Sequence, residues 1–152
     1  MTLRERLKND MKEGMRSRDQ ERVSVIRLLF ATIKNKEIEK GKEACLSDEE
    51  ILSVIVAAAK QRRESIAQFT QAGRHELSEK ESRELSVLLG YLPEPLSEEA
   101  LLVRVKVAIA EAGITEVKQM GIVMKTLIPE LLGRAEGEAI RKMLQACLQE
   151  KR

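Results

Sequence analysis

The sequence predicts an all-α protein, with an N-terminal four-helix domain followed by a small C-terminal three-helix domain. Apolar residues recur at intervals of three and four through most of the 152 residues, which is the period of helices that bury one face. Hydrophobic residues make up 43% of the chain and aromatic residues only 2%. The core must therefore be built from aliphatic side chains and Met, which favours helix-on-helix packing. No segment alternates for long enough to predict a strand.

The first two helices are predicted from their start and stop signals. Thr2 and Glu5 form a Thr-x-x-Glu capping box, and the helix that it opens should end near Arg16. A Ser-Arg-Asp turn at residues 17–19 leads into a longer helix. This second helix should end before Gly41, because glycine readily adopts the left-handed conformation that stops a helix.

The third and fourth helices carry similar signals. Ser47 and Glu50 form a second capping box, and the helical pattern then continues until Gly73. Ser78 and Glu81 form a third box, which should open a shorter helix.

Two prolines mark the expected domain boundary. Pro93 and Pro95 each lack an N–H donor and disfavour helical geometry in the residue before them. We therefore expect one domain at residues 1–92 and a second at residues 93–152.

Three shorter helices are predicted in the second domain. Ser97 should cap the first of them and Gly113 should end it. Thr115 can cap the next helix, which Pro129 is expected to kink or shorten. A glycine turn at residues 133–137 precedes a final amphipathic helix that runs to the charged end of the chain.

The sequence shows no pattern of side chains typical of a catalytic site. Catalysis needs a nucleophile held against a base, opposed carboxylates or a metal cluster. The single histidine, His75, is expected in a loop, and Cys45 and Cys147 have no metal-ligand spacing. Both cysteines are expected to be ordinary reduced thiols, and no phosphate-binding glycine loop occurs. We expect no catalytic residue, no metal and no cofactor.

The N-terminal region carries charges every few residues and no apolar run of signal-peptide length. No stretch of about 18 apolar residues could span a bilayer. These observations predict a cytoplasmic protein without a membrane partner.

Residues 60–77 form the most distinctive segment of the chain. A basic helical stretch is followed by Ser-Ile, an aromatic residue, Ala-Gly-Arg and an acidic-Leu pair. Further landmarks are Ser-Val-Ile-Arg-Leu-Leu at 24–29, Tyr-Leu-Pro at 91–93 and Met-Gly-x-Val-Met at 120–124. With these motifs the chain resembles the GatB/YqeY-like family over essentially its whole length.

The glycine turn at 133–137 carries a second resemblance. Its sequence, Gly-Arg-Ala-Glu-Gly, is similar to the Gly-[Lys/Arg]-Ala-Asp-Gly turn that YqeY proteins share with the GatB tail, the C-terminal part of a tRNA-dependent amidotransferase subunit. This resemblance covers only about residues 93–152. Glu136 departs from it by replacing Asp, and Pro95 stands where such sequences often carry Gln. The family implies a two-domain helical fold, a link to tRNA and the label of a carbon-nitrogen ligase with glutamine as amido donor.

Any RNA binding by the second domain must depend on local placement of charge. The domain has nine basic and nine acidic residues and no aromatic residue, so only phosphate and shape contacts are available to it. Gly133 and Gly137 could leave backbone N–H groups open to an anion. The alternative is an ordinary mixed-charge helical surface. The candidate RNA-binding side chains are Lys125, Arg134, Arg141 and Lys142.

The first helix offers a second basic surface, in which four cations follow one another at intervals of four. This stripe could track phosphates or sit on an anionic membrane surface. The alternative is that its methylene stems lie along the edge of the core while the charged heads stay in water. The stripe consists of Arg4, Lys8, Lys12 and Arg16. A further cation, Arg62, falls on the apolar side of its helix and could pair with a carboxylate of another helix.

Together these patterns predict a noncatalytic tRNA- or RNA-associated accessory protein, with an amidotransferase or a tRNA-processing protein as a further partner. The alternative is a helical protein-protein interaction module without nucleic acid. An amidotransferase activity of the chain itself is the third hypothesis. A ligase label would more readily describe a fragment of a larger machine, because no nucleophile for ammonia release is visible in the sequence.

Overall fold

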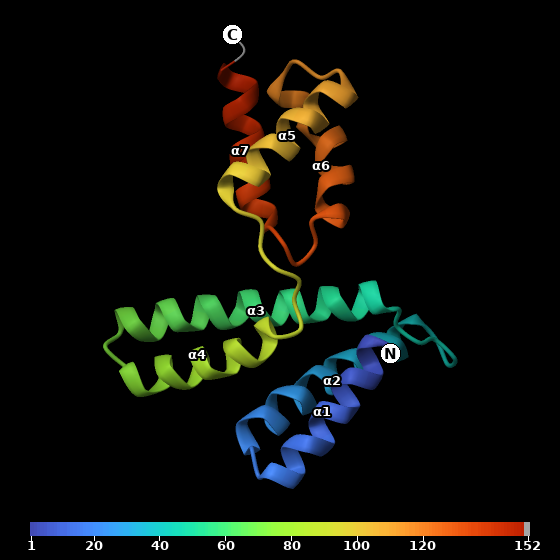
Figure 1. Cartoon of the computed structure of the whole chain (residues 1–152), viewed down its shortest axis with the longest axis vertical. Helices are drawn as coiled ribbons and strands as arrows, with labels where there is room; N and C mark the ends of the chain where they lie inside the picture. Colours follow the sequence, from blue (N-terminus) through green and yellow to red (C-terminus); the bar gives the residue numbers. More distant parts are fainter. Residues whose placement is uncertain (151–152) are drawn as a thin grey trace. The chain divides into compact units, whose positions relative to one another are not determined.

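The structure is a computed structural model that describes residues 1–150 (Figure 1). Within these residues the regular elements are seven α-helices and one short 3₁₀ helix, with no strand. The predicted all-α fold class is therefore confirmed. The chain divides into two compact units, of which the first is Met1–Leu92 and the second begins at Pro93.

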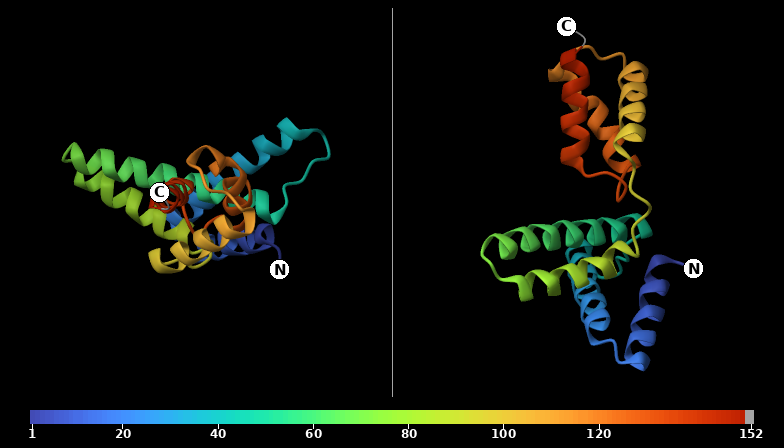
Figure 2. Two further views of the ribbon diagram at one scale, coloured as in Figure 1. Left: turned by 90° about the horizontal axis from the view of Figure 1, so that it is seen from above. Right: turned by 60° about the vertical axis from the view of Figure 1, so that its left-hand side comes forward.

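Four helices form the first unit. Figures 1 and 2 show them as two helical hairpins, α1 with α2 and α3 with α4. The longest pair, α3 and α4, lies side by side over most of the length of α4. The helices are α1 (Leu3–Ser17), α2 (Gln20–Lys40), α3 (Asp48–Gln71) and α4 (His75–Leu89).

Local capping explains where two of these helices begin. Thr2 Oγ1 accepts the Glu5 N–H at 3.1 Å, and the Glu5 carboxylate accepts the Thr2 N–H at 3.1 Å. Ser47 and Glu50 make the same reciprocal pair before α3. These two predicted capping boxes are therefore confirmed. Each satisfies backbone donors that the first helical turn leaves without a partner.

The predicted third capping box is wrong. Helix α4 begins at His75, so Ser78 already lies inside it and its N–H donates to the Arg74 carbonyl at 3.1 Å. The Ser78 hydroxyl instead shares a 2.8 Å hydrogen bond with the hydroxyl of Thr70 on α3. His75, which was expected in a loop, is the first residue of the helix.

Helix α1 also runs slightly further than expected, to Ser17. Arg18 then adopts the left-handed conformation, with φ +60°. The Arg18 N–H donates to the Gly14 carbonyl, and the Asp19 N–H donates to the same carbonyl at 2.9 Å. A non-glycine residue in this region carries a steric cost, which this hydrogen bond offsets.

The core of the first unit is aliphatic, as the composition predicts. Its fully buried side chains come from all four helices, so burial of apolar surface holds both hairpins together. They include Leu7, Ile26, Ile33, Ile51, Ile55 and Leu88.

The second unit is a small bundle of three helices with its own aliphatic core. Arg104 on α5 (Glu98–Ala112) binds Glu130 at the end of α6 (Met120–Glu130) through a bidentate pair, at 2.6 and 2.7 Å. The elements are α5 (Glu98–Ala112), η1 (Val117–Gln119), α6 (Met120–Glu130) and α7 (Gly137–Glu150). The core includes Val105, Ile109, Leu127, Ile140, Leu144 and Leu148.

Ser97 caps α5 as predicted, with its hydroxyl accepting the Ala100 N–H at 3.1 Å. Thr115 does not cap the next helix. The Gln119 side chain accepts the Thr115 N–H instead, and the short η1 helix intervenes before α6. Helix α6 ends at Glu130, one residue after Pro129, which agrees with the expected shortening. The predicted continuation of the last helix beyond Glu150 lies outside the described residues.

Candidate functional site

The glycine turn of the second unit joins α6 to α7. Gly133 has φ +80°, a left-handed conformation that favours glycine. The N–H groups of Arg134 and Ala135 both donate to the Leu131 carbonyl, at 2.8 and 3.1 Å. The turn is therefore tight, and it closes on the end of α6.

The turn is also tied to the first residues of the second unit. The Leu96 N–H donates to the Arg134 carbonyl at 2.9 Å, and Arg134 Nε donates to the Glu94 carbonyl at 3.0 Å. Two hydrogen bonds thus hold Arg134 at the surface, one through its backbone and one through its side chain. Its side chain makes no ion pair with any residue between 1 and 150, so the guanidinium charge is not neutralised there.

Arg141 has a different environment from Arg134. It makes a bidentate pair with Glu138, at 2.6 and 3.2 Å, and a further 3.3 Å hydrogen bond to Gln145. The hydrogen bonds that Arg141 donates to the Glu138 carboxylate raise the pKa of Arg141 above its ordinary value. The charge of this predicted RNA-binding residue is therefore largely balanced within its own helix.

Two lysines complete the predicted set. Lys125 lies on the exposed side of α6 and Lys142 on the exposed side of α7. Neither makes a hydrogen bond or ion pair with the residues that the structure describes. The turn itself also carries Glu136, and Glu138 follows it in the first turn of α7. Gly137 has open space around it. The assignment of these residues to RNA remains a prediction.

The second basic surface is divided by one ion pair. Arg4 is half-buried and its guanidinium binds Glu37 of α2 at 2.5 Å. Lys8, Lys12 and Arg16 are exposed on α1. Arg4 thus helps to join two helices, whereas the other three cations face solvent.

One cation of the distinctive segment at 60–77, Arg62, has a structural role. Arg62 on α3 pairs with two carboxylates of α4, Glu81 at 3.3 Å and Glu84 at 3.2 Å. All three side chains are largely buried between the helices. The predicted pairing of Arg62 with another helix is therefore present, and this arginine stabilises the α3–α4 hairpin.

Two features of the first unit could not be recognised in the sequence. Glu37 accepts the Leu46 N–H at 2.9 Å in addition to the Arg4 pair, and so fixes the loop at residues 41–47. A surface hollow of about 580 Å³ lies between α1, α2 and this loop. The only signal for it in the sequence is a group of cations near the end of α2, which is common on helical surfaces.

The described residues contain no group of three or more His, Cys, Asp or Glu side chains that could hold a metal ion. Cys45 is exposed in the first unit and Cys147 is buried in the second. None of the helices in the described range has the length and apolar character needed to cross a membrane.

Comparison with known sequences gives consistent matches. A sequence model described as "Yqey-like protein" matches residues 4–148. The "Altered inheritance of mitochondria protein 41, mitochondrial" of Pyrenophora tritici-repentis is 33% identical over 144 residues, which cover 92% of this chain and 77% of that protein.

Proteins of the same name match over a shorter range in two yeasts. The Kluyveromyces lactis protein is 39% identical over 85 residues, which cover 56% of this chain and 45% of the relative. The Eremothecium gossypii protein is 40% identical over 88 residues, covering 57% and 46%. The chain thus spans about half the length of these relatives. Their names also contradict the predicted cytoplasmic location, because the relatives are mitochondrial proteins.

Proposed function

Because this chain belongs to the YqeY-like protein family, we propose that it is a noncatalytic accessory protein that associates with tRNA or another structured RNA through its second unit. An amidotransferase or a tRNA-processing protein would be a further partner in the same assembly. One observation carries the proposal, which is the way Arg134 is held at the turn between α6 and α7.

Arg134 has the properties of an anion-binding arginine. Its Nε is used by the Glu94 carbonyl, and the two terminal nitrogens of the guanidinium remain for a ligand. An arginine whose orientation is already fixed loses less conformational entropy when it binds, and its planar group suits phosphate oxygens. The absence of a carboxylate partner within residues 1–150 leaves its full charge for a phosphate.

Lys125 and Lys142 support the same proposal, since both present unpaired charge on the helices that flank the turn. Arg141 contributes less, because Glu138 already uses its donors. Glu136 and Glu138 oppose an anion at the turn. The expected interaction is therefore a small number of phosphate contacts centred on Arg134, with weak affinity and strong dependence on salt.

The test is to replace Arg134 and measure binding of labelled tRNA by fluorescence anisotropy. Arg134→Ala should weaken binding severalfold and reduce the salt slope by about 1, as expected for the loss of one phosphate contact. Lys106→Ala, on the exposed side of α5, removes the same charge and is the matched control. If both variants bind tRNA as the parent does, or if both weaken binding equally, Arg134 is not an RNA contact.

A second candidate function is protein docking, which one observation favours. Val103 and Val107 on α5 are 64% and 43% exposed, and with Ala100 and Ala110 they form a stripe at the spacing of helix-in-groove recognition. Purification of the full chain distinguishes the two functions. Recovery of discrete tRNA above a mock purification supports the first, and stoichiometric recovery of a protein partner without RNA supports the second.

A further inference from the structure

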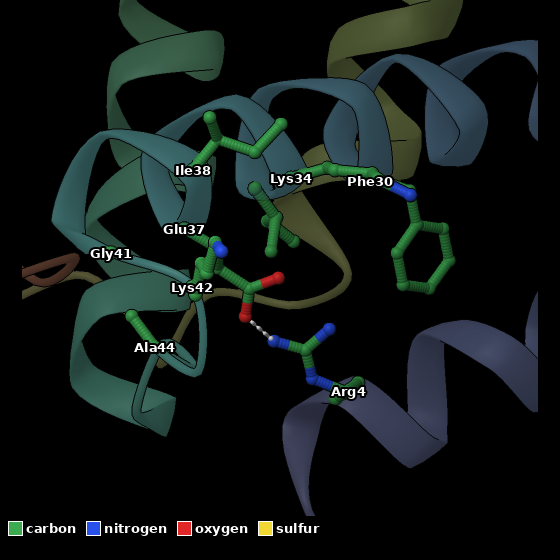
Figure 3. A pocket seen from close by; sticks show the side chains of 9 residues that line it. Arg4, Phe30, Lys34, Glu37, Ile38, Gly41, Lys42 and Ala44 are labelled. Atoms are coloured by element: carbon green, nitrogen blue, oxygen red, sulfur yellow. Dashed lines mark hydrogen bonds and ion pairs between the residues drawn. The ribbon is translucent and has the colours of Figure 1, made fainter.

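The hollow of about 580 Å³ in the first unit is independent of the proposed RNA contacts, because nine residues of α1, α2 and the 41–47 loop line it. Its size falls within the range of small-molecule sites. In Figure 3 the Arg4 side chain reaches from α1 toward the Glu37 carboxylate, with the Phe30 ring on one side of this pair and Lys42 and Ala44 on the other.

Part of the lining is apolar. Phe30 is half-buried, Ile33 is buried, and Ala44 comes from the loop. Ile38 contributes a side chain that is 68% exposed. These side chains offer a hydrocarbon group a place where it can leave water.

The rest of the lining is predominantly cationic. Arg4, Lys34 and Lys42 stand against a single carboxylate, that of Glu37. Glu37 Oε2 accepts from Arg4 at 2.5 Å and from the Leu46 N–H at 2.9 Å, so this carboxylate balances the charge of Arg4. Lys34 and Lys42 make no hydrogen bond or ion pair with residues in the described part of the chain. The hollow therefore keeps an excess of positive charge.

The walls of the hollow are also held in place before any ligand arrives. Glu37 connects α1, through Arg4, to the 41–47 loop, through Leu46. The Leu3 N–H adds a 3.2 Å hydrogen bond to Asp48, the first residue of α3. A preformed site of this kind loses little conformational entropy on binding.

We propose that this hollow binds a small amphipathic anion, with its charged head at Lys34 and Lys42 and a short hydrocarbon chain against Phe30, Ile33 and Ile38. The head is a carboxylate or a phosphate monoester, the two anions that ammonium and guanidinium groups commonly bind. This site does not depend on the RNA contacts of the second unit.

Lys42 has an alternative role, because a cation just past the end of α2 interacts favourably with the negative end of the helix dipole. Lys34 lies more than one turn before that end. That role requires no ligand and no apolar neighbour. The two roles predict different results for a probe that combines charge with a hydrocarbon chain.

The experiment uses the full chain, labelled with ¹⁵N, and four probes: octanoate, octyl phosphate, inorganic phosphate and octanol. Saturable shifts of amide signals around residues 30–44 with octanoate or octyl phosphate are expected, and the tighter of the two identifies the head group. Equal binding of octanol, equal binding of inorganic phosphate, or no saturable shift with either amphipathic anion would overturn the proposal.

Variants then test the residues. Lys34→Ala and Lys42→Ala should each weaken binding about two- to fivefold, the range of one exposed charge contact. Ile38→Ser should weaken binding of the chain-bearing probes alone. Lys36→Ala is the matched control, because this exposed lysine of α2 lines a different hollow, beside Glu39 and Glu50. Equal losses in all three lysine variants would mean that general charge, rather than this hollow, attracts the anion. Spectra of the unliganded variants report whether each is folded.

Discussion

Tyr91 donates its hydroxyl hydrogen to Asp10 Oδ2 over 2.5 Å, and so joins the end of the first unit to a helix that lies 81 residues earlier in the chain. Arg22 binds the other oxygen of Asp10 at 3.3 Å. The Arg6 guanidinium lies 4.7 Å from the centre of the Tyr91 ring and donates to the Gly90 carbonyl at 2.8 Å. Burial of the ring, and after it the hydrogen bond to Asp10, raises the pKa of Tyr91 above its ordinary value.

Replacing the hydroxyl tests this connection. Tyr91→Phe should lower the free energy of unfolding of the first unit by about 1 kcal/mol, because one hydrogen bond is lost and the ring still packs. Urea denaturation followed through amide signals of residues 1–92 measures the change. An unchanged midpoint would show that the hydrogen bond to Asp10 contributes nothing to stability.

Arg62 should contribute more to the free energy of unfolding than an exposed arginine does. Arg62→Leu leaves Glu81 and Glu84 without their shared cation, and the three side chains are only 20%, 17% and 11% exposed. We expect a loss of about 1–3 kcal/mol, less than for a fully buried pair because some solvent screening remains. The same urea experiment measures it. Arg27→Leu, on an exposed face of α2, is the control and should change stability by less than about 0.5 kcal/mol.

Acid should weaken the first unit through Glu37. The Leu46 N–H, helped by Arg4, lowers the pKa of this carboxyl below its ordinary value of 4.5. The folded state therefore binds the Glu37 proton less readily than the unfolded chain does. The resulting stability is present above pH 4.5 and is lost as the pH falls toward the lowered pKa. Urea midpoints measured from pH 7 to pH 3 should fall less steeply for Glu37→Gln than for the parent, and parallel curves would contradict this role.

The two glycines of the turn should respond differently to the same change. Gly133→Ala places a Cβ on a residue with φ +80° and should cost about 1 kcal/mol. Gly137→Ala has open space around the new methyl group and should stay within about 0.5 kcal/mol of the parent. Thermal unfolding of both variants, compared side by side, measures the difference, and equal melting temperatures would show that the turn tolerates a side chain at Gly133.

Binding of tRNA, where it occurs, should fall steeply with salt. The second unit has no aromatic residue to stack on bases, so phosphate contacts supply its affinity and each releases a counterion. Anisotropy titrations between about 50 and 200 mM salt give the slope. Affinity that stays constant over this range would exclude contacts of this kind.

Capping signals in the sequence predicted the starts of helices correctly where no other group competed for the same backbone donors. The Thr2 and Ser47 boxes are made by residues three apart, and nothing else competes for their donors. The Ser78 box fails because the tight turn at Gly73, with φ +73°, lets the helix begin four residues earlier, with Arg74 in place of Ser78 as the residue that precedes it. Arg18 gave no signal, since left-handed arginine is uncommon and depends here on contacts around Gly14.

The sites were harder to predict, because their contacts join residues that are distant in sequence. The hydrogen bond from Arg134 to Glu94 spans 40 residues, and the pair of Arg4 with Glu37 spans 33. The periodicity of single helices places a side chain on a face but does not say which other element meets that face. The pairing of Arg141 with Glu138 is different, since two residues three apart on a helix are expected neighbours.

The hydrogen bonds that Arg134 makes to Glu94 and Leu96 also set an order for folding during synthesis. The first unit is complete once Leu92 has left the ribosome, and domains generally fold as units, with the N-terminal one first. The beginning of the second unit is ordered later, because Glu94 and Leu96 form their hydrogen bonds with Arg134, which is synthesised 40 residues after Glu94. Helices α5 and α6 must then wait for the glycine turn and α7, so the second unit closes only after these later elements have emerged from the ribosome.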